Sequence, residues 1–134
     1  LSVLVYNEVS MAYSDTIKLV VGDTLPELSF TLKDSNTAAS GKTLDEEDNT
    51  TWAPIDLSGA TVKLRIREVG KTTVLSTITC TITDATNGVC TLTFPSGTWT
   101  TAGTFEGEIE HTTSGSGIQT VQDFIKFKVR DDFD

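Results

Sequence analysis

The chain has 134 residues, 37% of them hydrophobic and 22% charged, and a formal net charge of −9. A chain of this length is expected to fold as one domain whose core needs neither a metal nor a disulfide framework. The acidic balance argues against binding along nucleic-acid phosphates, and no apolar run approaches the ~18 residues of a membrane span, so neither nucleic acid nor membrane is an expected partner.

Residues 1–15 are predicted to be an N-terminal arm or extension that precedes the folded domain. Two interpretations of the arm stay open: a frayed terminus, or a segment that pairs with the sheet edge of a neighbouring subunit. In the second case Leu4 and Tyr6 are candidate interaction residues.

Residues 16–134 consist of short runs in which apolar and polar residues alternate, separated by turn-forming residues. A period of two is typical of strands that bury one face. Seven strands are predicted, at 16–21, 28–33, 60–69, 73–83, 88–94, 104–111 and 119–130. A long polar loop at 34–54 separates the second strand from the third, and loops of this length are usually functional or disordered.

Three of these strands carry charged residues on their polar faces. The charges have one sign within each strand and run basic, acidic, basic from strand to strand. The charged positions are Lys63, Arg65 and Arg67 in the third strand, Glu106, Glu108 and Glu110 in the sixth, and Lys126, Lys128 and Arg130 in the seventh. Opposite charges on neighbouring strands attract and like charges repel. We therefore expect the sixth strand to lie between the third and the seventh in one sheet.

The strand count and turn spacing predict an all-β fold, an immunoglobulin-like β-sandwich of about seven antiparallel strands. Phe105 stands at the start of the sixth strand, where such domains often carry a tyrosine, so a packed corner without a hydroxyl hydrogen bond is expected. Cys80 and Cys90 are predicted to point inward but to be offset by one pairing step across a hairpin. They are therefore interpreted as buried free thiols.

The sequence shows no arrangement of residues that is typical of an active site. His111 is the only histidine, lies at the end of the acidic strand, and is interpreted as a surface residue. The acidic cluster at 45–48 lacks the spacing of a calcium loop and is interpreted as solvated. No catalytic residue, metal ligand or cofactor is predicted, and the protein is expected not to be an enzyme.

Trp52 and Trp99 both lie in irregular, polar segments. A large ring in such a segment either caps an open end of the sandwich or anchors a partner. Both roles stay open for the two residues, which makes them candidate interaction residues.

Three stretches, 22–32, 54–67 and 101–108, together resemble the Ig-like domains of tailed-bacteriophage structural proteins, notably the N-terminal domain of baseplate upper proteins. The resemblance spans about 16–130, and its most specific element is Asp-Leu-Ser-Gly-Ala-Thr-Val at 56–62. A structural role is expected for this element. Asp56 or Ser58 would bond neighbouring backbone amides, and Gly59 would supply a positive φ.

The resemblance implies a non-enzymatic component of a phage virion, in the baseplate, tail or neck. It further implies a homo-oligomer in a symmetric assembly with other phage structural proteins as partners. Two alternatives stay open: a capsid-decorating protein of the phage head, and a bacterial surface module for adhesion or carbohydrate binding.

Overall fold

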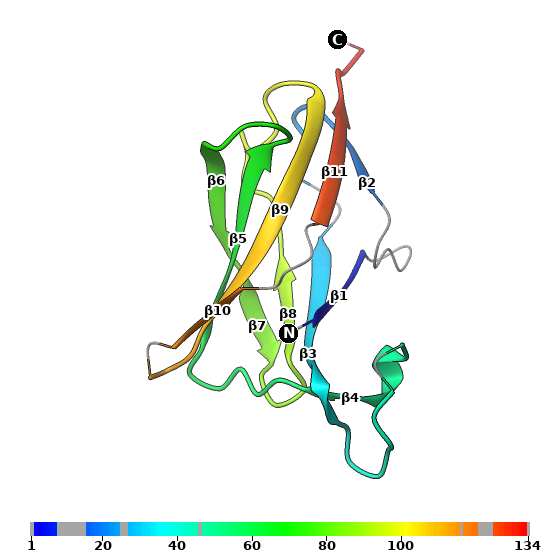
Figure 1. The fold of residues 1–134 in the computed structure, drawn as a ribbon. Helices are drawn as coiled ribbons and strands as arrows, with labels where there is room; N and C mark the ends of the chain where they lie inside the picture. Colours follow the sequence, from blue (N-terminus) through cyan, green and yellow to red (C-terminus); the bar gives the residue numbers. More distant parts are fainter. Residues whose placement is uncertain are drawn as a thin grey trace.

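Two β-sheets packed face to face form the fold in the computed structural model, which describes residues 2–7, 16–24, 27–45, 47–115, 117–120 and 125–133 (Figure 1). The elements are β1 (Ser2–Asn7), β2 (Ile17–Val20), β3 (Leu28–Ala38), η1 (Asn49–Thr51), β4 (Trp52–Pro54), β5 (Thr61–Glu68), β6 (Val74–Thr79), β7 (Thr81–Asp84), β8 (Val89–Leu92), β9 (Gly103–Thr112), β10 (Ile118–Thr120) and β11 (Ile125–Arg130). None of the described segments is a helix with the length and apolarity that crossing a bilayer requires.

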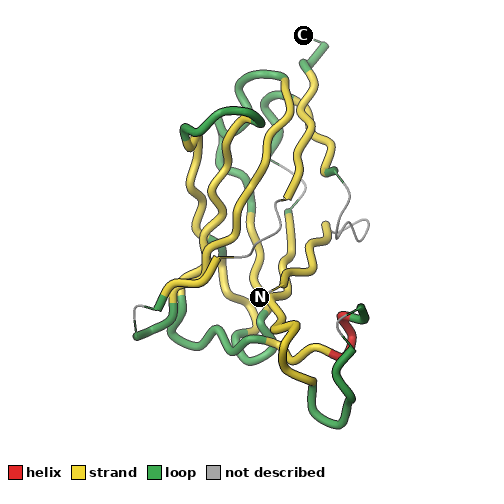
Figure 2. Tube along the Cα trace, in the orientation of Figure 1, coloured by secondary structure: helices red, strands yellow, loops and turns green. Residues whose placement is uncertain are grey.

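The first sheet has the order β1-β3-β8-β7, with β4 also paired to β3. The second has the order β2-β11-β9-β5-β6, with β10 paired to β9. The expected immunoglobulin-like β-sandwich is confirmed, and so is the central place of the sixth predicted strand, β9, between β5 and β11. The connecting segments gather at the two ends of the sheets (Figure 2).

One strand pair departs from the predicted antiparallel arrangement. β2 runs parallel to β11, whereas the other strand pairs of the described chain are antiparallel. β1 belongs to the first sheet and β2 to the second, so the N-terminal part of the chain contributes to both layers.

The N-terminal arm predicted at 1–15 is not wholly separate from the sandwich. Residues 2–7 form β1, which pairs antiparallel with β3 from Ser2↔Lys33 to Asn7↔Leu28. This part of the arm is bonded within its own chain, and residues 8–15 lie outside the described residues.

The loop predicted at 34–54 is also shorter than expected. β3 continues to Ala38 and β4 pairs back onto it, so the segment between these strands is 39–51, and it ends with η1. The alternation of apolar residues ends near Lys33, although the backbone pairing does not, because the end of β3 extends beyond the core.

The strand predicted at 73–83 is two strands in different sheets. β6 belongs to the second sheet and β7 to the first, and the chain crosses between the layers at Cys80. Alternation continues through the crossing because Ile78 and Cys80 both face the core. The predicted strand at 119–130 includes β10 and β11, which both belong to the second sheet, and residues 121–124 lie outside the described residues.

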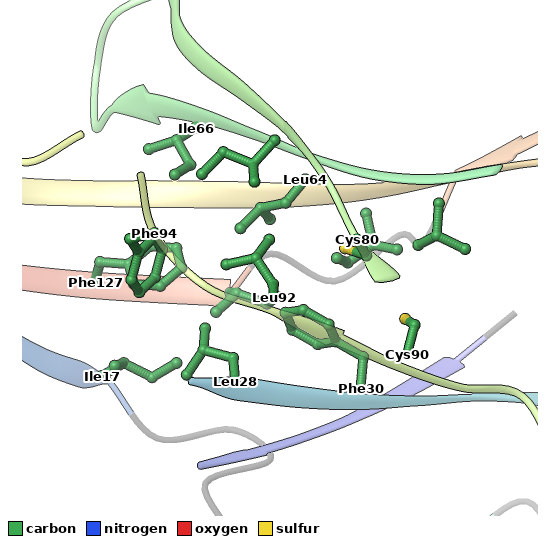
Figure 3. Close-up of a cluster of buried hydrophobic side chains, with 14 of the residues drawn as sticks. Ile17, Leu28, Phe30, Leu64, Ile66, Cys80, Cys90, Leu92, Phe94 and Phe127 are labelled. Carbon is green, nitrogen blue, oxygen red and sulfur yellow. The ribbon is translucent and has the colours of Figure 1, made fainter. Parts of the chain in front are cut away.

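The core lies between the sheets and consists of the inward faces of both (Figure 3). Leu28, Phe30 and Leu32 are fully buried, as their alternation predicts. Cys90 pairs with Ile82 and not with Cys80, so the predicted offset between the two cysteines is confirmed, as are their burial and their free thiols.

Candidate functional site

The outer face of the second sheet carries the predicted charge pattern in part. Arg65 forms an ion pair with Glu110, and Arg67 Nε lies 2.7 Å from Glu106 Oε1. On the other side of β9, Glu106 is opposite Lys126. Each such exposed pair contributes about 0.2–1 kcal/mol, so the pattern fixes strand register more than it stabilises the fold.

The pattern does not extend along the whole of β11. Lys128 is opposite Thr104, so the acidic row of β9 ends before the basic row of β11 does. The expected order of the three strands holds, but Lys128 of β11 has no carboxylate directly opposite it on β9. The ladder of oppositely charged pairs covers β5 and the first part of β11 only.

One edge of the second sheet is formed by β6, which has no charged side chain and exposes two aliphatic ones at its start. Val74 is 48% exposed and Leu75 57%, and Val69, the first residue of the turn between β5 and β6, is 49% exposed. The register between β5 and β6 shifts after Ile66, so that Ser76 and Val74 have partners on β5 and Leu75 has none. Leu75 is therefore displaced outward at a bulge of the edge strand.

A small pocket of about 80 Å³ opens beside this edge on the outer face of the sheet. Its lining combines Val74 with charged side chains of the two neighbouring strands: Arg65, Arg67, Glu106 and Glu108. Glu108 is opposite Arg65, but Arg65 pairs diagonally with Glu110 instead. The edge of β6 thus has an apolar rim and a charged pocket next to it.

A second pocket, of about 340 Å³, lies at the opposite edge of the same sheet, over the parallel pair of β2 and β11. It is lined by Lys18, Leu19, Val20, Asp23, Lys128 and Arg130. Three of these side chains are cationic and one is anionic.

The two tryptophans lie inside the protein. Trp99 is 2% exposed, and its ring centroid lies 5.2 Å from those of Phe94 and Phe127 and 5.3 Å from that of Phe105. Trp52 is 8% exposed, and its indole Nε1 donates a hydrogen bond to the Asp45 carbonyl at 3.0 Å. Of the two roles left open by the sequence, this geometry corresponds to capping.

The turn before β5 has the geometry expected for it. The amide and the hydroxyl of Ser58 both donate to Asp56 Oδ1, at 2.9 and 2.6 Å, and these hydrogen bonds lower the pKa of Asp56. Gly59 has a φ of +71°, and Leu57 is fully buried. The segment is a tight bend that plugs the end of the sandwich, and its carboxylate is already occupied by its own chain.

The other sequence-predicted positions are divided between the core and the N-terminal strand. Phe105 is 3% exposed and packs edge-on against Trp99, as a corner without a hydroxyl would. The backbones of Leu4 and Tyr6 pair with Thr31 and Ser29, but their side chains lie outside the described residues.

His111 is buried, so its interpretation as a surface histidine is wrong. It is 3% exposed and shares the inward face of β9 with Ile109 and Phe105. Neither ring nitrogen has a hydrogen-bond partner in the described part of the chain. Burial without a partner lowers the pKa of His111 from its ordinary value of 6.5.

This burial predicts an acid-sensitive fold. As the pH falls below 6.5, the unfolded chain binds a proton at His111 while the folded chain does not, because the pKa of His111 is lower in the folded chain. The contribution of this residue to the free energy of unfolding is therefore greatest above pH 6.5 and decreases as the pH falls toward the folded-state pKa. Replacing His111→Leu should flatten the stability curve in this window, where carboxylates, with ordinary pKa values of about 4, titrate little. Urea unfolding at several pH values gives the free energy of unfolding as a function of pH for the parent protein and for His111→Leu. Equal slopes for the two proteins would assign the pH dependence to another group.

Metal-ligating residues do not gather in the described part of the chain. No group of three or more histidine, cysteine, aspartate or glutamate side chains there is placed to hold a metal ion. In the acidic segment, the hydroxyl and amide of Thr50 bond to Asp48 and lower the pKa of that carboxyl.

Known protein families and curated proteins include no match to this sequence. A similar solved structure is CopC from Methylosinus trichosporium OB3b, with 8% sequence identity and a TM-score of 0.44 over 89% of this chain and 89% of that chain. Another is the PmoD soluble domain from Methylocystis sp. ATCC 49242 (Rockwell), with 10% identity and a TM-score of 0.44 over 96% of this chain and 89% of that chain. At these scores the likeness assigns no ligand or activity to this chain.

The comparisons contradict the phage resemblance, because the similar structures are CopC and PmoD domains and not phage proteins. The implied baseplate, tail or neck role is wrong, and so are the capsid-decorating alternative, the phage partners in a symmetric homo-oligomer and the virion location. The most specific element, 56–62, is a hydrogen-bonded bend into a strand, which many β-sandwiches need. Nothing in the geometry of the described residues favours the adhesion or carbohydrate-binding alternative.

Proposed function

We propose that this chain is a non-catalytic protein-binding domain that takes an extended segment of a partner protein as an added strand along β6. The observation that carries this proposal is the exposed, apolar and uncharged edge of the second sheet, formed by Val74 and Leu75 with Val69 beside them.

An edge strand presents a row of unpaired backbone N–H and C=O groups. Soluble proteins usually protect such an edge with a charged side chain such as lysine, a proline, a bulge or a short strand. β6 has six residues and none of these side chains: Val-Leu-Ser-Thr-Ile-Thr. By contrast, the edge strand β2 has four residues and includes Lys18, and β7 has four and includes Asp84. The bulge at Leu75 interrupts β6 near its start, but the stretch from Ser76 to Thr79 has neither a charged side chain nor a proline. Such an edge is costly in a free protein and useful in one that binds a strand.

The surroundings of β6 indicate what the added strand would present. Main-chain hydrogen bonds to β6 would give affinity, and side chains at alternate positions would give selectivity. Aliphatic side chains would cover Val74 and Leu75, and the pocket of about 80 Å³ beside Val74 would take one small side chain between the charged groups. The partner segment is therefore an alternating, largely aliphatic peptide.

The non-catalytic part of the proposal is supported by where the reactive groups lie. His111 is 3% exposed, and Cys80 and Cys90 are 6% and 0% exposed. The side-chain hydrogen bond that Cys80 makes with Cys90, together with burial, raises the pKa of Cys80, which keeps that thiol protonated. These groups are sealed from any substrate in the core.

The test is a selection of random peptides displayed on yeast, followed by titration of an enriched synthetic peptide. Leu75→Lys should weaken binding of that peptide by tenfold or more, because it removes apolar contact and adds a charge at the edge. Ile118→Lys is the matched control, since Ile118 is 68% exposed on β10, away from β6, and should leave affinity unchanged. Failure to enrich any peptide sensitive to Leu75→Lys would refute the proposal.

A further inference from the structure

The edge of the second sheet opposite to β6 holds an unusual pairing of like charges. Lys18 of β2 is directly paired with Lys128 of β11, on the outer face of the sheet. Like charges at directly opposed positions repel one another. In the described chain neither lysine forms an ion pair with a carboxylate, and the residue opposite Lys128 on the other side is Thr104.

A third cation is held at the same place. Arg130 follows Lys128 on the same face of β11 and lines the same pocket. Its Nη1 donates a hydrogen bond to the Asp131 carbonyl at 2.9 Å, which orients the guanidinium and leaves its other donors available. An oriented guanidinium matches the geometry of phosphate oxygens.

The fourth charged residue of the pocket sets the charge that a ligand would need. Asp23 Oδ2 accepts a hydrogen bond from the Val20 amide at 2.9 Å, so this carboxylate is engaged by the backbone. Three cations and this one anion leave two positive charges in a protein whose formal net charge is −9. An anion with two negative charges would neutralise them.

We propose that the pocket between β2 and β11 binds a phosphate-type dianion through Lys18, Lys128 and Arg130. The bound anion would offset the repulsion between the two lysines, which the fold otherwise leaves uncompensated. The pocket volume of about 340 Å³ exceeds what one phosphate fills and lies within the range of small-molecule clefts, so the phosphoryl group of a small organic molecule would also fit. This site is separate from the proposed strand-binding edge.

The probes are sodium phosphate and phenyl phosphate, compared with sodium chloride at equal ionic strength. Phosphate should raise the melting temperature of the protein and shift the amide resonances of β2 and β11 above the effect of chloride. Lys128→Gln should weaken phosphate binding about tenfold, as expected for one lost charge-assisted hydrogen bond. Lys63→Gln is the matched control, because Lys63 lies on the same face but opposite Glu110.

A second readout separates binding from a general structural effect. In chloride alone, Lys128→Gln should raise the melting temperature, because it removes the repulsion with Lys18, and phosphate should then add little. Tighter binding of phenyl phosphate than of phosphate would identify a phosphorylated small molecule as the ligand, and equal binding would identify the free anion. A phosphate effect no larger than that of chloride, an equal loss in Lys63→Gln, or a lower melting temperature of Lys128→Gln in chloride would overturn the proposal.

Discussion

Replacing Trp99→Ala is expected to lower the free energy of unfolding by about 3–5 kcal/mol, the usual cost of removing a large buried aromatic side chain. Trp99 lies at the centre of an aromatic cluster with Phe105 and Phe127, which are paired on β9 and β11 of the second sheet, and with Phe94, which follows β8 of the first sheet. The substitution would leave a cavity at one end of the sandwich and remove three ring contacts at once. Ordinary domains have a free energy of unfolding of about 5–15 kcal/mol, so this substitution would remove a large part of it.

Trp52→Ala is the matched control for this prediction. Trp52 is also buried, but it lies outside the main core cluster and its indole bonds to the 39–51 segment. Its removal should loosen that segment and cost clearly less in global unfolding. Chemical denaturation followed by circular dichroism measures both variants. Equal small losses would mean that Trp99 does not hold the two sheets together.

Gly88→Ala is expected to destabilise the fold by about 3 kcal/mol or more, from overpacking and left-handed backbone strain together. Gly88 has a φ of +71°, and a Cβ there would lie 2.5 Å from the Leu32 carbonyl oxygen and 2.9 Å from that of Ile55. The Leu32 carbonyl already accepts the Ile55 amide at 3.0 Å, and the Leu32 amide donates to the Gly88 carbonyl at 2.8 Å. A methyl group would therefore disrupt a junction of three backbone segments.

Gly70→Ala separates the two contributions. Gly70 also has a positive φ, +85°, but a Cβ there meets nothing within 4 Å. The Gly70→Ala variant should therefore have backbone strain without a steric clash, which lowers the free energy of unfolding by about 1 kcal/mol. Thermal or urea unfolding of the two variants gives the difference, which measures the steric clash at Gly88. No difference between them would show that the junction is looser than the structure indicates.

Much of the fold follows from the period of two along the strands. The alternation of Leu28, Phe30 and Leu32 with polar residues placed their side chains correctly in the core. The charges of β5 and β9 predicted that the two strands are neighbours, because the register that buries the apolar residues also pairs Arg67 with Glu106.

The same periodicity contained information that the interpretation of His111 did not use. His111 has the same parity as Phe105 and Ile109 on β9, which predicts an inward side chain. Its polarity favoured a surface position, but strand geometry decides the direction in which a side chain points. Burying a histidine without a hydrogen-bond partner lowers the stability of the fold. The residue types near His111 in the sequence do not show that the rest of the structure offsets this loss.

Other features depend on contacts between distant segments and leave no local pattern. The crossing of the chain between sheets at Cys80 keeps the inward alternation intact, so one strand was predicted where β6 and β7 lie. The parallel pairing of β2 with β11 brings Lys18 beside Lys128 across more than a hundred residues of sequence. The exposed edge at Leu75 likewise depends on which strand ends the sheet.

Backbone amide exchange along β6 tests the proposed function most directly. Hydrogen–deuterium exchange is measured for the whole chain, free and saturated with a peptide enriched in the selection. Strand addition predicts that the amides of β6 that point away from β5 exchange fast in the free protein and become protected in the complex, while the edges at β2 and β7 keep their rates. Protection confined to another edge or to the loops, with β6 unchanged, would contradict the account.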